Sequence, residues 1–232
     1  MSIATLTPSA DSVDDVAPAT FADLLERLGG VPPERIRLQP PPGTATEADA
    51  LANEHCELID GVLVEKAMGY PDSRIGQVIA SYLEIWLAQS KLGFVIGDGA
   101  MTRMQTGNMR IPDVCVTLWT RVGGTEVPGE QISGVVPDIA IEVLSPRNTE
   151  REIERKRLEF FDSGTEQVWI VRPRTQTIDV WTSVSQMSVL GIADSLNGAP
   201  VLPGFQVQVL EVFEAARRGH IDLNIVRAWM NN

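Results

Sequence analysis

Residues 137–149 read PDIAIEVLSPRNT, and this segment is the most informative indicator of the fold. Its short, β-branched apolar run is typical of a buried central strand. Thr149 and Glu152 have the spacing of a capping box, and Gly164 marks the end of the helix that follows. A central strand that leads into a helix favours an α/β fold.

The segments on either side predict further strands and helices. Residues 56–65 read as two strands around the turn Asp60-Gly61. A helix is expected from Asp72 and Ser73 to Gly93. Strands are expected in 94–104, 109–119, 167–173, 177–183 and 188–192, and a last strand with a helix start in 201–213. Because strands and helices intermix, we expect a central mixed β-sheet flanked by helices.

The two ends of the chain differ from its middle. Residues 1–20 are rich in Ser, Ala, Asp and Pro without periodicity, which predicts a disordered N-terminal tail. Residues 21–54 predict a short helix, starting at Thr20, and a Pro-rich segment that is an extended linker or a surface loop. The main domain is expected to span 55–213, and residues 214–232 to form a C-terminal helical extension.

Composition limits the classes of function. The 232 residues include 31 acids and 19 bases, a formal net charge of −12. Such a charge counts against tight, non-specific binding of nucleic acid through a global field. Cys56 and Cys115 read as buried free thiols, which fits a reducing compartment. With no signal peptide and no membrane span expected, we predict a soluble, cytoplasmic protein.

Three carboxylates lie in or beside apolar strands, where an unpaired charge is costly: Asp113, Asp138 and Glu142. Asp138 and Glu142 are about 13 Å apart along one strand, so they cannot grip the same ion. Asp113 belongs to another strand and can lie beside Glu142, because neighbouring strands are about 4.8 Å apart. This pair, with the backbone carbonyl of Val143, predicts a site for Mg²⁺ or Mn²⁺. Asp138 fits better as a strand-entry or capping residue.

The helix after this strand adds a cation. Lys156 lies near Ile153 and Phe160 on a helical wheel, and Arg157 is a rival by geometry alone. A lysine beside a metal can orient or deprotonate a water, or stabilise charge on a phosphate. Two carboxylates, a hard cation and a lysine recur in phosphodiester hydrolysis.

Simpler interpretations of the same residues stay open at this point. Asp113 follows Pro112 and can cap a turn. Glu142 and Lys156 can form a structural ion pair. Lys156 can also be a solvated side chain on a charged helix.

Five segments resemble, in this order, the Uma2 family of restriction endonucleases: ELIDGVLVEKAMG (57–69), RIPDVCV (110–116), PDIAIEVLSPRNT (137–149), RKRLEFFDSG (155–164) and VLPGF (201–205). That family is similar to the PD-(D/E)XK nuclease superfamily, which implies a restriction-endonuclease-like fold. The resemblance assigns the first acid to Asp113 and the second to Glu142.

The resemblance also bears on the lysine and on a further acid. The usual lysine position of the superfamily holds Leu144 here, and Lys156 of the following helix takes its place. An additional acid near the first helix is assigned to Asp72, with Glu57 as the second choice.

The function implied is a Mg²⁺- or Mn²⁺-dependent endonuclease that hydrolyses phosphodiester bonds of nucleic acid, with DNA as the expected substrate. A homodimer is expected, since two sites are needed to cut two strands. The acidic charge keeps two alternatives open: a non-catalytic binding or assembly module on the same fold, and a phosphodiesterase acting on a small phosphorylated compound.

Overall fold

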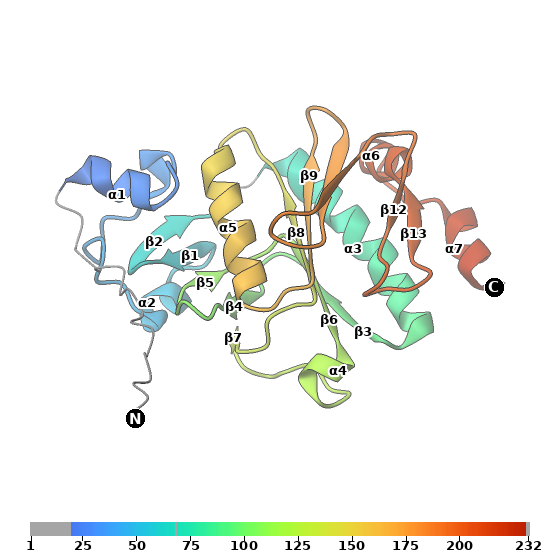
Figure 1. The fold of residues 1–232 in the computed structure, drawn as a ribbon, viewed down its shortest axis with the longest axis horizontal. Coiled ribbons are helices and arrows are strands. Elements are labelled where there is room, and N and C mark those ends of the chain that lie inside the picture. Colours follow the sequence, from blue (N-terminus) through green and yellow to red (C-terminus); the bar gives the residue numbers. More distant parts are fainter. Residues whose placement is uncertain (1–19, 68, 231–232) are drawn as a thin grey trace, which may run out of the picture.

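The computed structural model describes residues 20–67 and 69–230, and its centre is a six-stranded sheet. The strand order is β11-β10-β9-β8-β6-β3 (Figure 1). β8 and β9 pair in parallel, and the other neighbours pair antiparallel. The mixed sheet expected from the sequence is therefore confirmed. The bounds are β3 Gly93–Ile96, β6 Val114–Leu118, β8 Ile139–Val143, β9 Gln167–Arg172, β10 Thr177–Trp181 and β11 Met187–Leu190.

A second sheet, in the order β2-β1-β5-β4-β7, lies on the side of α5 away from the C-terminal helices (Figure 1). Its first two strands form the expected hairpin, and Asp60 and Gly61 both have positive φ, as a tight two-residue turn requires. The bounds are β1 Cys56–Ile59, β2 Val62–Glu65, β4 Met101–Arg103, β5 Met109–Arg110 and β7 Ile132–Ser133. A small third sheet pairs β12 Ser195–Asn197 with β13 Gln206–Gln208.

Two long helices cover opposite faces of the six-stranded sheet: α3 Tyr70–Ser90 and α5 Glu150–Asp162 (Figure 1). Side chains alternate along β8, so Ile139 and Ile141 pack in the core cluster of α3. Ala140 packs in the cluster of α5, with Ile153 and Phe160 of that helix. Glu142 has the same parity as Ala140. The central acid therefore points toward α5.

The remaining helices flank these layers. Their bounds are α1 Phe21–Arg27, α2 Glu47–Ala52, α4 Trp119–Val122, α6 Val209–Arg218 and α7 Leu223–Met230. Thr149 caps α5 through the capping box that the sequence predicts. Thr20 caps α1 through a capping box of its own, with Asp23. None of the helices in 20–67 and 69–230 combines the length and apolar character that crossing a bilayer would take.

Several expected boundaries are wrong. The segment 31–54 is no extended linker, because it forms a 3₁₀ turn at Pro33–Arg35 and helix α2. α3 begins at Tyr70 rather than Asp72, with Pro71 in its first turn, and ends at Ser90 rather than Gly93. Asp113 immediately precedes β6 instead of lying within a strand.

The limits of the tail and of the C-terminal extension also differ from the expectation. The proposed boundary at 213/214 lies inside α6, and residues of α6 and α7 share the main core with α3. The tail expected over 1–20 lies outside the described residues except for Thr20, which caps α1. Cys56 and Cys115 are buried and free, as expected.

The N-terminal segment is fixed to the rest of the molecule by Arg35. Its side chain is 2% exposed, and its guanidinium forms two hydrogen bonds to the Glu152 carboxylate, at 2.7 and 2.8 Å. The same guanidinium donates to the Glu65 carbonyl at 2.7 Å. One buried cation therefore joins the turn at Pro33–Arg35, the end of β2 and the start of α5.

We predict that Arg35→Ala lowers the free energy of unfolding by about 3–5 kcal/mol, because it leaves the Glu152 carboxylate buried and unpaired. Urea unfolding followed by circular dichroism measures this. Arg37→Ala is the matched control: Arg37 pairs with Glu65 at 54% exposure, so its loss should cost about 0–1 kcal/mol. Equal effects of the two substitutions would contradict this account of Arg35.

Candidate metal site

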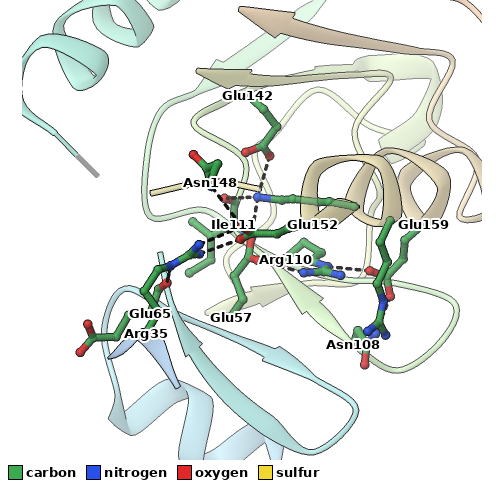
Figure 2. A network of polar contacts seen from close by, with 12 residues as sticks. Arg35, Glu57, Glu65, Asn108, Arg110, Ile111, Glu142, Asn148, Glu152 and Glu159 are labelled. Atoms are coloured by element: carbon green, nitrogen blue, oxygen red, sulfur yellow. Dashed lines mark hydrogen bonds and ion pairs between the residues drawn. The ribbon is translucent and has the colours of Figure 1, made fainter. Parts of the chain in front are cut away.

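The two acids singled out in the sequence, Asp113 and Glu142, line one small cavity. Val143, Lys156, Glu57 and Lys66 line it too, and its volume is about 10 Å³. β8 supplies Glu142, α5 supplies Lys156 and β1 supplies Glu57. The cavity therefore lies where the six-stranded sheet, α5 and the second sheet meet (Figure 2).

Asp113 is held beside β8 by the backbone. Its Oδ2 accepts the N–H of Val143 at 2.6 Å, and its own N–H donates to the Ile141 carbonyl at 3.1 Å. Its Oδ1 lies 2.7 Å from Nζ of Lys66. These partners belong to a neighbouring strand and to another segment, so a turn cap is not what fixes this side chain.

Glu142 is a buried carboxylate with an incompletely satisfied oxygen. The residue is 6% exposed, and its Oε1 lies 2.7 Å from Nζ of Lys156 but has no partner in hydrogen-bonding geometry. Burial raises the pKa of Glu142 to about 8, and the charge of Asp113 adds to this, although Lys156 acts in the opposite direction. A carboxylate whose ionised form is this poorly accommodated favours a further cation beside it.

Lys156 is buried, not solvated. Its Nζ lies 2.7 Å from Glu57 Oε1 and 2.7 Å from Glu142 Oε1, and donates to the Ile111 carbonyl at 3.3 Å. The ion pair with Glu142 considered in the sequence is thus present. Burial lowers the pKa of Lys156, but Glu142 and Glu57 outweigh it and the net direction is upward.

Arg157, the rival of Lys156, belongs to a different surface. Its guanidinium lies 3.7 Å from the centre of the Trp181 ring and donates to the Val184 carbonyl at 2.9 Å. These contacts place it over β10, away from Glu142.

Glu57, the second choice for an additional acid, supports Lys156 from β1. Its Oε1 also accepts the Ile111 N–H at 2.9 Å, and its Oε2 pairs with Arg110 at 3.0 Å. Arg110 continues to Glu159 of α5 at 2.6 Å (Figure 2). Burial acts to raise the pKa of Glu57, yet Lys156 and Arg110 outweigh it and hold the pKa at about 2. The ion pairs therefore tie the second sheet to α5.

Lys66 is part of the site and was missed from the sequence. It follows β2, is 8% exposed, and its Nζ contacts Asp98 at 2.5 Å and Asp113 at 2.7 Å. A lysine directly after a hairpin strand is ordinarily solvated, so the pattern gave no reason to choose it. Its two partners come from other segments of the chain.

Asp72 and Asp138 fall outside the cavity. Asp72 lies in the first turn of α3; burial raises its pKa, and the nearby charge of Asp113 adds to the increase. Asp138 accepts the Leu118 N–H at 2.7 Å and pairs with Arg121 at 2.6 Å, as expected of a strand-entry residue.

A model of the Uma2 family, described as "Putative restriction endonuclease", matches residues 45–212. The chain belongs to the Uma2 family. Its fold is similar to the crystal structure of "a putative nuclease belonging to DUF820" from Anabaena variabilis, with a TM-score of 0.64 and 19% sequence identity. That similarity covers 74% of this chain and 98% of the other, and it shows a nuclease-like fold. A comparison with curated proteins finds no match.

The donor chemistry of Asp113 and Glu142, two carboxylates that line one cavity, matches a hard cation that keeps several of its own waters. Within residues 20–67 and 69–230, no group of three or more His, Cys, Asp or Glu side chains is arranged to hold an ion. Asp113 and Glu142 are a pair, and Mg²⁺ is commonly bound by one or two carboxylates with waters in its other positions. The unpartnered oxygen of Glu142 supports the same fit.

We predict that Glu57→Gln lowers the free energy of unfolding at pH 7 by about 3–5 kcal/mol, because Lys156 and Arg110 lose a buried counter-charge. The pKa of Glu57 lies below the usual 4.5, so its charge stabilises the folded state above pH 4.5. That contribution is lost as the pH falls from 4.5 toward 2. The difference between wild type and variant should shrink over this window.

Denaturant unfolding at several pH values tests this prediction. Glu65→Gln is the control, because Glu65 is 35% exposed and pairs with the exposed Arg37. A Glu57→Gln difference that stays constant from pH 7 to pH 3 would contradict the role given to the Glu57 charge.

Proposed function

We propose that this Uma2 protein is a divalent-metal-dependent endonuclease that hydrolyses phosphodiester bonds of nucleic acid, with DNA as the expected substrate. The observation that carries the proposal is the shared cavity of Asp113, Glu142 and Lys156 on a nuclease-like fold. Asp113 and Glu142 would hold Mg²⁺ or Mn²⁺, and the backbone carbonyl of Val143 is the third expected ligand. When bound, such an ion supplies an activated water and neutralises charge on a phosphoryl group.

Lys156 acts in this proposal as a fixed positive charge. Its nitrogen lies 2.7 Å from a carboxylate oxygen of Glu57 and 2.7 Å from one of Glu142. Burial lowers the pKa of Lys156, but these two acids outweigh it and raise the pKa above its ordinary value, so the amine keeps its proton. Of the roles considered for the lysine, stabilising negative charge on the phosphate therefore fits better than deprotonating water.

Glu57 is a positioning residue for Lys156. It contacts Nζ directly and is itself fixed by Arg110 and the Ile111 N–H. Asp72 supplies an additional negative charge near Asp113 at the start of α3. This arrangement supports an outer role for Asp72, through water, rather than direct contact with the ion.

A homodimer remains part of the proposal, because one metal site per chain would serve one strand of a duplex. Light scattering after size exclusion measures the oligomeric state directly. Cleavage of duplex and single-stranded substrates by the same sample then shows whether two sites act together.

We predict Mn²⁺- or Mg²⁺-dependent cleavage of a panel of plasmid, linear duplex, single-stranded DNA and RNA. Glu142→Ala should abolish cleavage and weaken Mn²⁺ binding, because the ion loses one of its two carboxylates. Lys156→Met should reduce the rate about 100-fold or more while Mn²⁺ binding persists, because a charge-stabilising group is lost.

Arg157→Leu is the matched control for Lys156→Met, since it removes the neighbouring cation of the same helix without touching the cavity. Circular dichroism confirms that each variant is folded. The proposal would be contradicted if no substrate is cleaved in the presence of metal. It would also be contradicted if Lys156→Met and Arg157→Leu reduce the cleavage rate equally.

A further inference from the structure

A positive charge already lies on one side of the proposed metal ligand Asp113. The Lys66 ammonium is 2.7 Å from Asp113 Oδ1 and 2.5 Å from Asp98 Oδ1. The Lys66 side chain is 5% exposed, whereas that of Asp98 is 35% exposed. Lys66 therefore bridges a carboxylate of the cavity and a carboxylate nearer the surface.

The cavity has too little room for a hydrated ion in this arrangement. Its volume of about 10 Å³ is close to what a single water needs. Mg²⁺ gives up its waters reluctantly and keeps several of them when it binds. A second cavity, of about 60 Å³, is lined by Asp113 and Asp98 together with Ser73 and Gly76. A side chain that lines the smaller cavity, beside Asp113 and Glu142, therefore has to move before the ion fits.

Lys66 is better suited to move than the other groups there. Lys156 is held by three oxygens, and Asp113 is held by the backbone N–H of Val143. Lys66 has a long flexible side chain and a second anionic partner, Asp98, on the more exposed side. It can release Asp113 and remain paired with Asp98.

We infer that Lys66 is a built-in competitor of the divalent metal: its ammonium neutralises Asp113 in the metal-free protein and moves toward Asp98 when an ion binds. The inference rests on the proposed function, since it takes Asp113 as a metal ligand. It gives Lys66 a role opposite to that of Lys156. Lys66 keeps the acidic cavity compact without metal and limits the affinity for it.

Calorimetric titration of the full chain with Mn²⁺ tests this inference. Lys66→Met should bind Mn²⁺ about tenfold more tightly or better, because a like charge beside the ion is removed. Asp98→Asn should bind Mn²⁺ several-fold more weakly. The Lys66 ammonium then lacks its second carboxylate, so it competes more strongly with the ion for Asp113. In the Lys66→Met background, Asp98→Asn should change the Mn²⁺ affinity much less, because the two residues act through the same ion pair.

The outcomes separate the inference from the proposed function. If wild type binds Mn²⁺ and Lys66→Met binds it equally or more weakly, Lys66 positions Asp113 and the inference is wrong, while the proposed function stands. If neither binds Mn²⁺, both fail. Glu142→Ala added to Lys66→Met should remove the gained affinity, which shows that the ion occupies the same cavity.

Thermal unfolding without metal checks that Lys66→Met is folded. If Lys66→Met does not fold, the Asp98→Asn variant tests the inference by itself. That variant should fold, because Asp98 is partly exposed and asparagine is nearly isosteric with aspartate. Weaker Mn²⁺ binding by that variant then supports the inference, and unchanged or tighter binding overturns it.

Discussion

Burial of the Glu142 carboxyl group beside the Lys156 ammonium sets the electrostatics of the whole site. Ionising a carboxyl group on a central strand costs several kcal/mol of desolvation unless a cation reaches it. α5 brings that cation across the face of the sheet, and its apolar residues Ile153 and Phe160 seat the helix on β8 and β9. The packing of one helix therefore sets the chemistry of the cavity.

A single helix does not fix a lysine by itself, and the second sheet completes the arrangement. Glu57 of β1 contacts Lys156, and Arg110 of β5 joins Glu57 to Glu159 of α5. Arg35 connects the N-terminal segment to the first turn of the same helix. The ion pairs follow one another along α5, so the sheet, the helix and the N-terminal segment support the site as one unit.

The sequence predicts the elements of this site better than their surroundings. The apolar run around Glu142 and the capping box at Thr149 are local patterns, so strand β8 and helix α5 follow from them. The spacing of neighbouring strands allowed Asp113 to lie beside Glu142, and the structure places both at one cavity. The family resemblance, not strand geometry alone, selected these two acids and Lys156.

Arg35 and Lys66 could not be assigned in the same way, because their partners are distant in sequence. Arg35 and Glu152 are separated by 117 residues, and the Pro-rich segment before β1 gave no sign of a buried arginine. Lys66 contacts Asp98 and Asp113, which only the folded chain brings together. A buried charge can be identified only when its ion-pair partner is known. These partners come together only in the tertiary structure.

A crystal structure with Mn²⁺, located by its anomalous scattering, would show directly which side chains bind the ion. We predict one strong anomalous peak in the cavity, with oxygens of both Asp113 and Glu142 in contact with the ion. A peak at other residues, or an ion that touches neither carboxylate, would contradict it.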